Sequence, residues 1–362
     1  MVSGPLAPGD ASEAPSRRNG PSLQPNVCII VLNWNGLADT LECVRSVLAI
    51  DYPNFEIIVV DNGSTDRSPQ VMEQEVRKFL NSSTASETSL TRALLGNSIQ
   101  VVSEAAARTA ARRSSSDSPL SSRFVLIRNE MNLGFAAGNN VGIGFAIAVF
   151  RPRYVFLLNN DTVVRPTFLT KLVSSMEADP SLGVAGPRLV DGQLVGTIPS
   201  TPCLVGRIHW VRFPGYSYGL PRANQLPSEN GILDCEWVSG AAMIIRAECF
   251  DHALLNAGYF FGCEDVEFCI NLRKAGWNVG IRPDAIVWHK GGVSRKRKFP
   301  TRFRFFLSGV LVCLKFVRNN RRDYPVLWYI YVVTIALLVI KLKLEDYFDR
   351  EIIIARPLRG LQ

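Results

Sequence analysis

The strongest constraint on the fold is a regular alternation of apolar runs and helical patterns along the first half of the chain. Continuous apolar runs rich in β-branched residues lie at 26–32, 55–60, 124–127 and 154–158. Runs of this length are typical of strands that are buried on both faces of a sheet. Because segments with helical spacing follow these runs, the pattern predicts a parallel, doubly wound α/β sheet.

The first helical segment follows the strand at 26–32. Apolar residues recur at helical spacing from Leu41 to Leu48, and Asp39 and Glu42 have the spacing of a capping box. We therefore expect a helix that begins near Asp39. Further helices are expected at 136–150 and 168–176.

Composition outside these runs sets the expected domain boundaries. Residues 1–25 are rich in Pro, Ser, Gly and Ala and lack the apolar core of a signal peptide, so we expect a disordered tail. One domain is expected over 26–294, with a variable insertion at 81–123 on the rim of the sheet that is partly helical near 104–112. The irregular spacing of 184–288 predicts a mixed half that completes the sheet and forms a second pocket wall.

Positive charge is concentrated in the C-terminal region, residues 295–362. The chain carries a net charge of +8, yet 295–322 contains ten Lys or Arg residues and no acid, so the rest of the chain carries −2. A local excess of this kind argues against a body wrapped in nucleic acid, and no nucleic-acid partner is expected.

An apolar stretch of 16 residues at 325–340 follows the basic block. It is shorter than the ~20 residues that a spanning helix needs, which favours amphipathic, membrane-associated helices over a full span without excluding the span. Together the two features predict peripheral attachment to an anionic membrane surface, on the cytoplasmic inner face of the cell membrane.

The eight cysteines lie singly in apolar surroundings, without CxxC pairs. This distribution favours buried, reduced thiols over disulfides.

Polar residues follow the predicted strands directly. Asp61 follows 55–60, and Asn160 and Asp161 follow 154–158. Ligands of open α/β sheets bind at the carboxyl ends of strands, so Asp61 is a candidate for binding a base or ribose and Asp161 for binding a divalent cation. The alternative for both carboxylates is a turn that caps the next helix.

A Gly- and Asn-rich loop at 132–140 enters a helix, and the exposed amides of a helix N-terminus favour anions. The loop lacks the GxGxxG pattern, and the chain lacks the P-loop pattern. These absences disfavour nicotinamide-dependent and P-loop enzymes.

Three carboxylates lie close together at Glu264, Asp265 and Glu267. At a helix N-terminus the helix dipole would stabilise such anions beside a cleft, although an acidic helix start is usually only a cap. His289, one of three histidines, lies beside Gly291 and Gly292. It is a candidate metal ligand, and the alternative is a structural histidine.

Seven segments, in order over about three-quarters of the chain, resemble glycosyltransferase family 2, and especially its rhamnosyltransferase-like branch. They are VCIIVLNWNG, IIVVDNGSTD, RNEMNLGFAAGNN, FLLNNDTVV, WVSGAAMIIR, FGCEDVEFCINLRKAGW and WHKGGVS. The resemblance implies a GT-A type fold, in which a Rossmann-like nucleotide-binding sheet is fused to a mixed acceptor-binding half.

The resemblance also assigns residues to the nucleotide-sugar donor. Asp61 is implied to hold the base or ribose, and Asp161, at the position of the family's DxD-like motif, to hold Mg²⁺ or Mn²⁺, with His289 as a further candidate ligand. Asn159 stands where many relatives have the first Asp of that motif. The other implied donor-site residues are Asn33, Asn35, Asn132, Gly134, Asn139 and Asn160.

For the acceptor, the resemblance implies that Asp265 is the catalytic base, with Glu264 beside it in the catalytic pair. Asp265 would take the proton of the acceptor hydroxyl while that oxygen attacks the anomeric carbon, inverting its configuration. Trp237, Gly240 and Ala241 are implied to shape the acceptor side. The absence of QxxRW argues for single additions rather than processive synthesis.

The expected function is therefore transfer of a sugar from a nucleotide-sugar donor to a lipid-linked or cell-envelope glycan acceptor. The expected donor is dTDP-rhamnose, with UDP-hexose or UDP-galactofuranose as alternatives on the same fold. A further alternative is a non-catalytic envelope scaffold.

Overall fold

The computed structural model describes residues 24–81, 99–112, 122–191, 205–208, 216–219, 227 and 231–290, together with single positions between 315 and 340. Nearly all of the predicted N-terminal tail, most of the basic block, and Cys203 and Cys313 lie outside the described residues.

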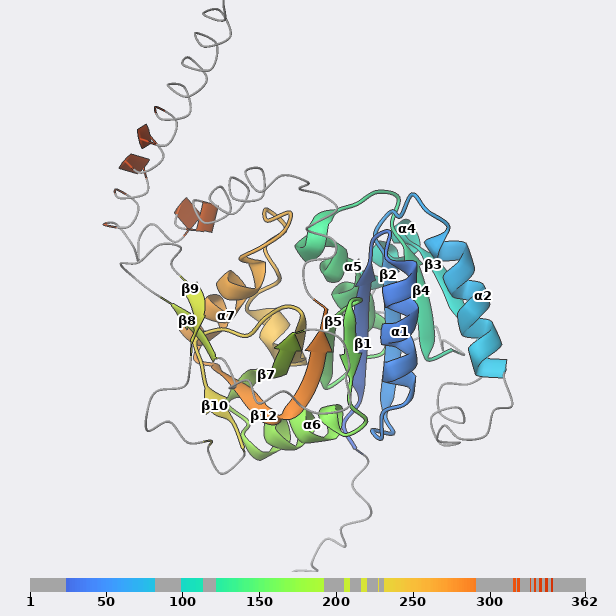
Figure 1. The fold of residues 1–362 in the computed structure, drawn as a ribbon, viewed down its shortest axis with the longest axis horizontal. Helices are drawn as coiled ribbons and strands as arrows, with labels where there is room; N and C mark the ends of the chain where they lie inside the picture. The colour runs from blue at the N-terminus through green and yellow to red at the C-terminus, as the bar shows by residue number, and fades with distance from the viewer. Residues whose placement is uncertain are drawn as a thin grey trace, which may run out of the picture.

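The fold is built on a ten-stranded sheet with the order β10-β12-β7-β11-β5-β1-β2-β4-β3, and β6 pairs with β12 (Figure 1). A separate hairpin is formed by β8 and β9. The strands are β1 (Val27–Asn33), β2 (Phe55–Asp61), β3 (Gln100–Ser103), β4 (Phe124–Arg128), β5 (Tyr154–Asn159), β6 (Thr162–Val164), β7 (Leu182–Asp191), β8 (Val205–Ile208), β9 (Tyr216–Gly219), β10 (Leu233–Asp234), β11 (Ala242–Arg246) and β12 (Asn278–His289).

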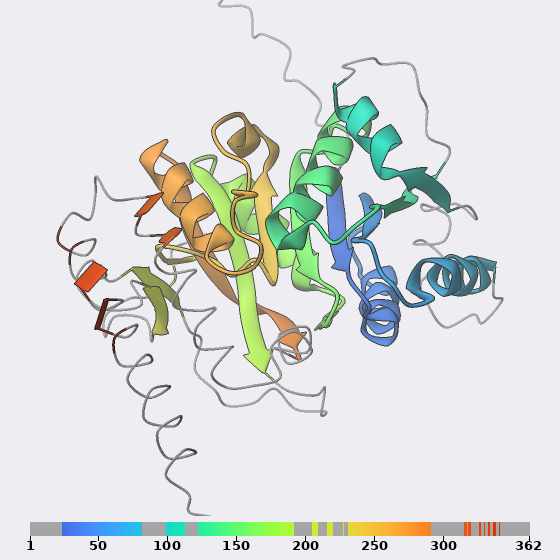
Figure 2. The ribbon, with the colours of Figure 1, turned by 90° about the horizontal axis from the view of Figure 1, so that it is seen from above.

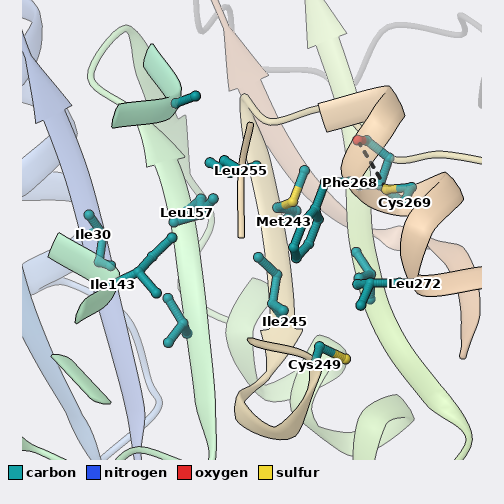
Figure 3. Close-up of a cluster of buried hydrophobic side chains, with 14 of the residues drawn as sticks. Ile30, Ile143, Leu157, Met243, Ile245, Cys249, Leu255, Phe268, Cys269 and Leu272 are labelled. Atoms are coloured by element: carbon teal, nitrogen blue, oxygen red, sulfur yellow. Dashed lines mark hydrogen bonds between the residues drawn. The ribbon is translucent and has the colours of Figure 1, made fainter. Parts of the chain in front are cut away.

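Helices cover both faces of the sheet (Figures 1 and 2). They are α1 (Leu37–Leu48), α2 (Ser68–Asn81), α4 (Glu104–Arg112), α5 (Gly134–Val149), α6 (Phe168–Ala178), α7 (Glu264–Lys274) and the 3₁₀ helix η1 (Ala247–Asp251). Successive strand residues point to opposite faces. Ile30 and Leu157 therefore pack on the face that carries α5 and α7 (Figure 3), and Ile29 and Phe156 on the face that carries α1 and α6.

The predicted division into a parallel half and a mixed half is confirmed. Strands β1, β2, β4 and β5 are parallel neighbours, whereas β11 runs antiparallel to both β5 and β7. The antiparallel strand brings the start of β11 to the carboxyl end of β5. The loop that leads into β11 therefore lies at the same end of the sheet as the carboxyl ends of the parallel strands.

The structure differs from the sequence analysis within the predicted insertion. The helix expected near 104–112 is present as α4, but Gln100–Ser103 forms β3, the edge strand of the main sheet, parallel to β4. Four residues with only Val102 strongly buried give a weak apolar signal, which explains why sequence analysis missed this strand.

The predicted capping box is wrong. Helix α1 begins at Leu37, and its N-cap Gly36 has no side-chain hydrogen bond. Asn33 Oδ1 instead accepts the Gly36 amide at 3.1 Å, and the Asp39 carboxylate pairs with Lys290 at 2.6 Å. A cation distant in sequence thus takes the carboxylate that the local pattern had assigned to the cap.

Six of the eight cysteines lie among the described residues, and all six are buried and free, as expected for reduced thiols. Among the residues that the structure describes, none of the helices is long and apolar enough to cross a membrane.

Glu56 of β2 gives a prediction about stability. Burial raises its pKa to about 7, and Arg123, 3.7 Å away, offsets only part of this effect. Since the pKa in the unfolded chain is lower, the folded state binds more protons between about pH 4.5 and pH 7, and the free energy of unfolding falls as pH rises through that window. Each pKa unit corresponds to about 1.4 kcal/mol, so the contribution approaches ~3 kcal/mol.

We therefore expect Glu56→Gln to gain stability relative to wild type as pH rises toward 8. Urea unfolding of both proteins at several pH values measures the difference, with the exposed Glu248→Gln as a control. Parallel pH profiles for wild type and Glu56→Gln would contradict this assignment.

Candidate active site

The candidate site lies at the carboxyl ends of the parallel strands. Asn33, the last residue of β1, pairs in register with Asp61, the last residue of β2, and Leu32 pairs with Asn159 at the end of β5. Residues separated by more than 120 positions in sequence therefore meet because their strands are neighbours in the sheet.

Asn33 is the centre of a buried hydrogen-bond network. Its Nδ2 donates to Asp61 Oδ2 at 2.8 Å, and its Oδ1 accepts from Thr40 Oγ1 at 2.9 Å. Asn160 Nδ2 donates to Thr40 Oγ1 at 2.9 Å. Asn33 is completely buried, so it orients Asp61 and Asn160 at the ends of two strands rather than presenting a free surface of its own.

The loop after β2 is held by two of the predicted residues. Asp61 Oδ1 accepts the Ser64 amide at 3.0 Å. Asn35, in the left-handed conformation with φ 52°, accepts the Thr65 amide at 2.8 Å through Oδ1. The loops after β1 and β2 are thereby fastened to each other.

The Gly- and Asn-rich loop before α5 is joined to the same edge by Asn62. Asn62 Nδ2 donates to Asn132 Oδ1 and to the Gly134 carbonyl, both at 3.0 Å. Gly134 has φ +83°, and a Cβ there would lie 2.5 Å from the Phe260 carbonyl oxygen, so the close approach requires glycine. Asn139 is buried one turn into α5 and donates to the Phe135 carbonyl at 3.0 Å.

Asp161 and His289 are brought together by strand pairing. Strand β6 runs antiparallel to β12 with Thr162 opposite His289. As a result, Asp161 Oδ1 lies 3.2 Å from His289 Nε2. The Lys290 amide donates to the Asp161 carbonyl at 3.0 Å, and Asn159 Nδ2 lies 3.5 Å from His289 Nε2.

Lys290 fixes the end of β12 against α1. Its Nζ lies 2.6 Å from both Asp39 and Glu42, and hydrogen bonds and charge from these carboxylates raise the pKa of Lys290 despite its partial desolvation.

Nearby, burial raises the pKa of the Cys43 thiol to about 12, so this residue stays protonated at neutral pH.

Asp265 lies in the first turn of α7 and contacts the start of β11. Its Oδ2 accepts the Gly240 amide at 2.9 Å. A Cβ on Gly240 would lie 3.1 Å from the Phe135 ring and 3.4 Å from Asp265 Cβ, so even alanine would require the Phe135 ring to move by a few tenths of an ångström. Asp265 is half-buried, whereas its neighbour Glu264 is 5% exposed.

The other two predicted acceptor-side residues lie beneath the surface. Trp237 is 3% exposed, belongs to the core under α7, and donates from Nε1 to the Arg207 carbonyl at 3.1 Å. Ala241 is 5% exposed, and its carbonyl accepts the Asn159 amide at 2.8 Å. Both therefore support the surface near Asp265 and contribute little surface of their own.

A continuous series of close contacts connects the predicted base with the predicted metal ligands. It passes through Asp265, Gly240, Ala241, Asn159, His289 and Asp161. The structure therefore gathers carboxylates, an imidazole and amide groups at one sheet edge.

Sequence analysis missed two residues that hold this site. Asn62 follows Asp61 directly at a strand end, and the rule that selected Asp61 would also have selected it. Lys290 follows His289, but its partners on α1 are some 250 residues away in sequence. No local signal predicts that pairing.

Comparison with known families identifies the class to which this site belongs. Residues 101–306 match Glycosyltransferase like family 2, and residues 28–83 match Glycosyl transferase family 2. The chain belongs to glycosyltransferase family 2, as predicted.

Among curated relatives, the hexosyltransferase Agl10 of low-salt glycan biosynthesis in Haloferax volcanii is 23% identical over 178 residues, which are 49% of this chain and 55% of that protein. The N-acetylglucosaminyl-diphospho-decaprenol L-rhamnosyltransferase of Mycobacterium tuberculosis is 28% identical over 146 residues, which are 38% of this chain and 46% of that protein. The chain thus spans about half the length of each relative.

Among solved structures, GalNAc-T7, crystallised with UDP, GalNAc and Mn²⁺, is similar with a TM-score of 0.54 and 15% identity. The similarity covers 74% of this chain and 44% of that one. This similarity confirms the GT-A type fold.

Proposed function

We propose that this protein transfers a sugar from a nucleotide-sugar donor to a glycan acceptor with inversion at the anomeric carbon. The observation that carries the proposal is the contact series from Asp265 to Asp161. This series connects the Asp265 carboxylate, in the first turn of α7, with the Asp161–His289 pair near the carboxyl ends of the parallel strands.

Asp265 is the proposed catalytic base. The acceptor oxygen attacks the anomeric carbon, the bond from that carbon to the diphosphate oxygen breaks, and the acceptor proton passes to the Asp265 carboxylate. The Gly240 amide holds Asp265 Oδ2 in place. Glu264 is more deeply buried than Asp265, which favours Asp265 for contact with a substrate.

The donor is proposed to bind along the ends of β1, β2 and β5. Asp61, whose carboxylate is held by Asn33 Nδ2, is proposed to bind the base or ribose. The loops that carry Asn35, Asn132, Gly134 and Asn160 are each fastened to this edge by hydrogen bonds. Asn139 is buried in α5, so it would support the donor site from inside the domain.

Asp161 and His289 fit a divalent cation such as Mn²⁺ or Mg²⁺. Carboxylate oxygen and imidazole nitrogen both bind divalent ions such as Mn²⁺. Asp161 Oδ1 and His289 Nε2 lie 3.2 Å apart. Among the described residues, no group of three or more His, Cys, Asp or Glu side chains is arranged so that it could hold a metal ion. Two protein ligands would leave coordination positions for diphosphate oxygens and water. When bound, the ion would offset the charge that develops on the leaving diphosphate.

We propose dTDP-rhamnose as donor and a lipid-linked glycan as acceptor. Support comes from the similarity to the N-acetylglucosaminyl-diphospho-decaprenol L-rhamnosyltransferase of Mycobacterium tuberculosis. UDP-hexose remains the second candidate, supported by the similarity to a hexosyltransferase.

Incubating the purified chain with dTDP-rhamnose, UDP-hexoses and UDP-galactofuranose and a lipid-diphosphate sugar tests these proposals by product mass. We expect a deoxyhexose mass increment. A hexose increment would overturn the rhamnose assignment alone. If no donor is bound or consumed, the transferase proposal fails and the scaffold alternative gains support.

We further propose peripheral attachment to an anionic membrane through the C-terminal region. The described positions of this region between 326 and 340 are apolar and exposed, including Tyr329 at 71% and Leu337 at 61%. Each Lys or Arg near an anionic surface contributes roughly 1 kcal/mol, and apolar burial adds to this attraction.

Replacing Leu337 and Ile340 with Glu should therefore release the protein from anionic vesicles in a flotation assay. Val101→Glu, at an exposed apolar position of β3, is the matched control and should remain bound. Flotation of the doubly substituted chain with those vesicles would refute this mode of attachment.

A further inference from the structure

A short helical piece of the C-terminal region is packed against the body of the enzyme, beside the helix that carries Asp265. Phe316 is 1% exposed and belongs to the same hydrophobic core cluster as Phe268 of α7. Lys315 Nζ donates to the Gly258 carbonyl and lies 5.4 Å from the centre of the Tyr259 ring. This part of the region is therefore joined to the folded domain.

The docked helical piece adds exposed Asn319 to a polar cluster centred on the buried Glu267. This carboxylate is 7% exposed. It accepts hydrogen bonds from Asn256 Nδ2 at 2.8 Å, from Tyr259 Oη, and from Asn319 Nδ2 at 3.4 Å. A buried carboxylate is costly unless it is paired, so each donor helps to fix the position of Glu267. Asn319 also donates to Tyr259 Oη at 3.3 Å.

Tyr259 and Asn256 both connect this cluster to the loop before α7. Burial and its hydrogen bond to Glu267 raise the pKa of Tyr259 well above its usual value, so the phenol remains a donor at neutral pH. The chain at residues 256–260 is therefore tied at Asn256 and Tyr259 to α7, and at Gly258 to the C-terminal helix.

The same loop reaches the candidate site on its other side. The Phe260 carbonyl accepts the Phe135 amide at 2.8 Å, at the start of α5. Gly262 and Cys263 follow with φ +97° and +68°, and they form the sharp entry to α7 directly before Glu264 and Asp265. A change in the loop would therefore act both on the start of the donor-side helix and on the orientation of Asp265.

We propose that the helical residues 315, 316, 318 and 319 form a positioning element of the active site, which holds loop 256–263 in the conformation that places Asp265. The C-terminal region thus has a second role besides membrane attachment. This inference rests on the proposed function where it concerns catalysis, but the structural coupling can be measured without it.

The test compares two variants of the full chain in the absence of membranes. Lys315→Met with Asn319→Ala removes the polar contacts to the loop and to Glu267. Arg318→Met removes the same charge from an exposed position of the same helical piece and is the matched control. Neither variant replaces buried Phe316, so both are expected to fold.

Hydrogen–deuterium exchange gives the first readout. We expect exchange in loop 256–263 to become about tenfold faster in the double variant, with α1 unchanged and with the control like wild type. Unchanged exchange in this loop would overturn the proposal, whether or not the protein transfers sugar.

Steady-state kinetics with a water-soluble acceptor analogue gives the second readout. We expect kcat to fall about tenfold or more in the double variant, because small misplacements of a reacting group are costly. A faster-exchanging loop with unchanged kcat would overturn the positioning role. A wild-type protein without transferase activity would instead refute the proposed function and leave the exchange result to decide the coupling.

Discussion

Replacement of Asp265 by Asn is expected to reduce kcat by at least about 10²-fold while leaving donor binding intact. General base catalysis typically contributes ~10²–10⁴ in rate, and an amide of nearly the same shape cannot take the acceptor proton. The amide oxygen of Asn can still accept the Gly240 N–H that now reaches Asp265 Oδ2 at 2.9 Å, whereas the Val266 N–H that donates to Oδ1 loses its acceptor. The contact to the loop before β11 should therefore survive. Initial rates of product formation and calorimetric titration with the nucleotide measure the two effects separately.

Two further variants make this result specific. Glu248→Gln, at an exposed position of η1, should retain full activity. Glu264→Gln tests the neighbouring carboxylate, which is 5% exposed and should matter less. A rate for Asp265→Asn within tenfold of wild type, or a larger loss for Glu264→Gln, would remove Asp265 from the role of base.

The second large effect should come from the pair formed by Asp161 and His289. Metal stabilisation of a leaving group is worth several kcal/mol, and each 1.4 kcal/mol is about tenfold in rate. We therefore expect EDTA to stop turnover, Mn²⁺ or Mg²⁺ to restore it, and Asp161→Asn or His289→Ala to lose at least about 10²-fold.

The variants should also need more metal to reach half of their own maximal rate, which a titration with Mn²⁺ measures. The exposed Asp251→Asn is the control and should behave as wild type. Full wild-type activity in excess chelator would show that the reaction runs without a divalent ion and that Asp161 and His289 have another role.

Several strands and the ends that carry the polar residues were predictable from the sequence. Apolar runs at 26–32 and 55–60 became β1 and β2, and Asp61 lies at the end of its strand as expected. The edge strand β3 was missed because an edge position buries few side chains and leaves a weak apolar pattern. The capping box failed because α1 begins at Leu37, two residues before Asp39, and Asp39 pairs instead with Lys290, far away in sequence.

The sequence by itself determined the local elements, because apolar periodicity and buried β-branched runs depend on residues that are neighbours along the chain. Only the tertiary structure decided which polar residues meet. Asp161 faces His289 because β6 pairs with β12, and the Gly240 amide reaches Asp265 because β11 runs antiparallel to β5 and starts beside α7. Strand register and contacts between loops are set by packing of the whole sheet, so no short stretch of sequence encodes them.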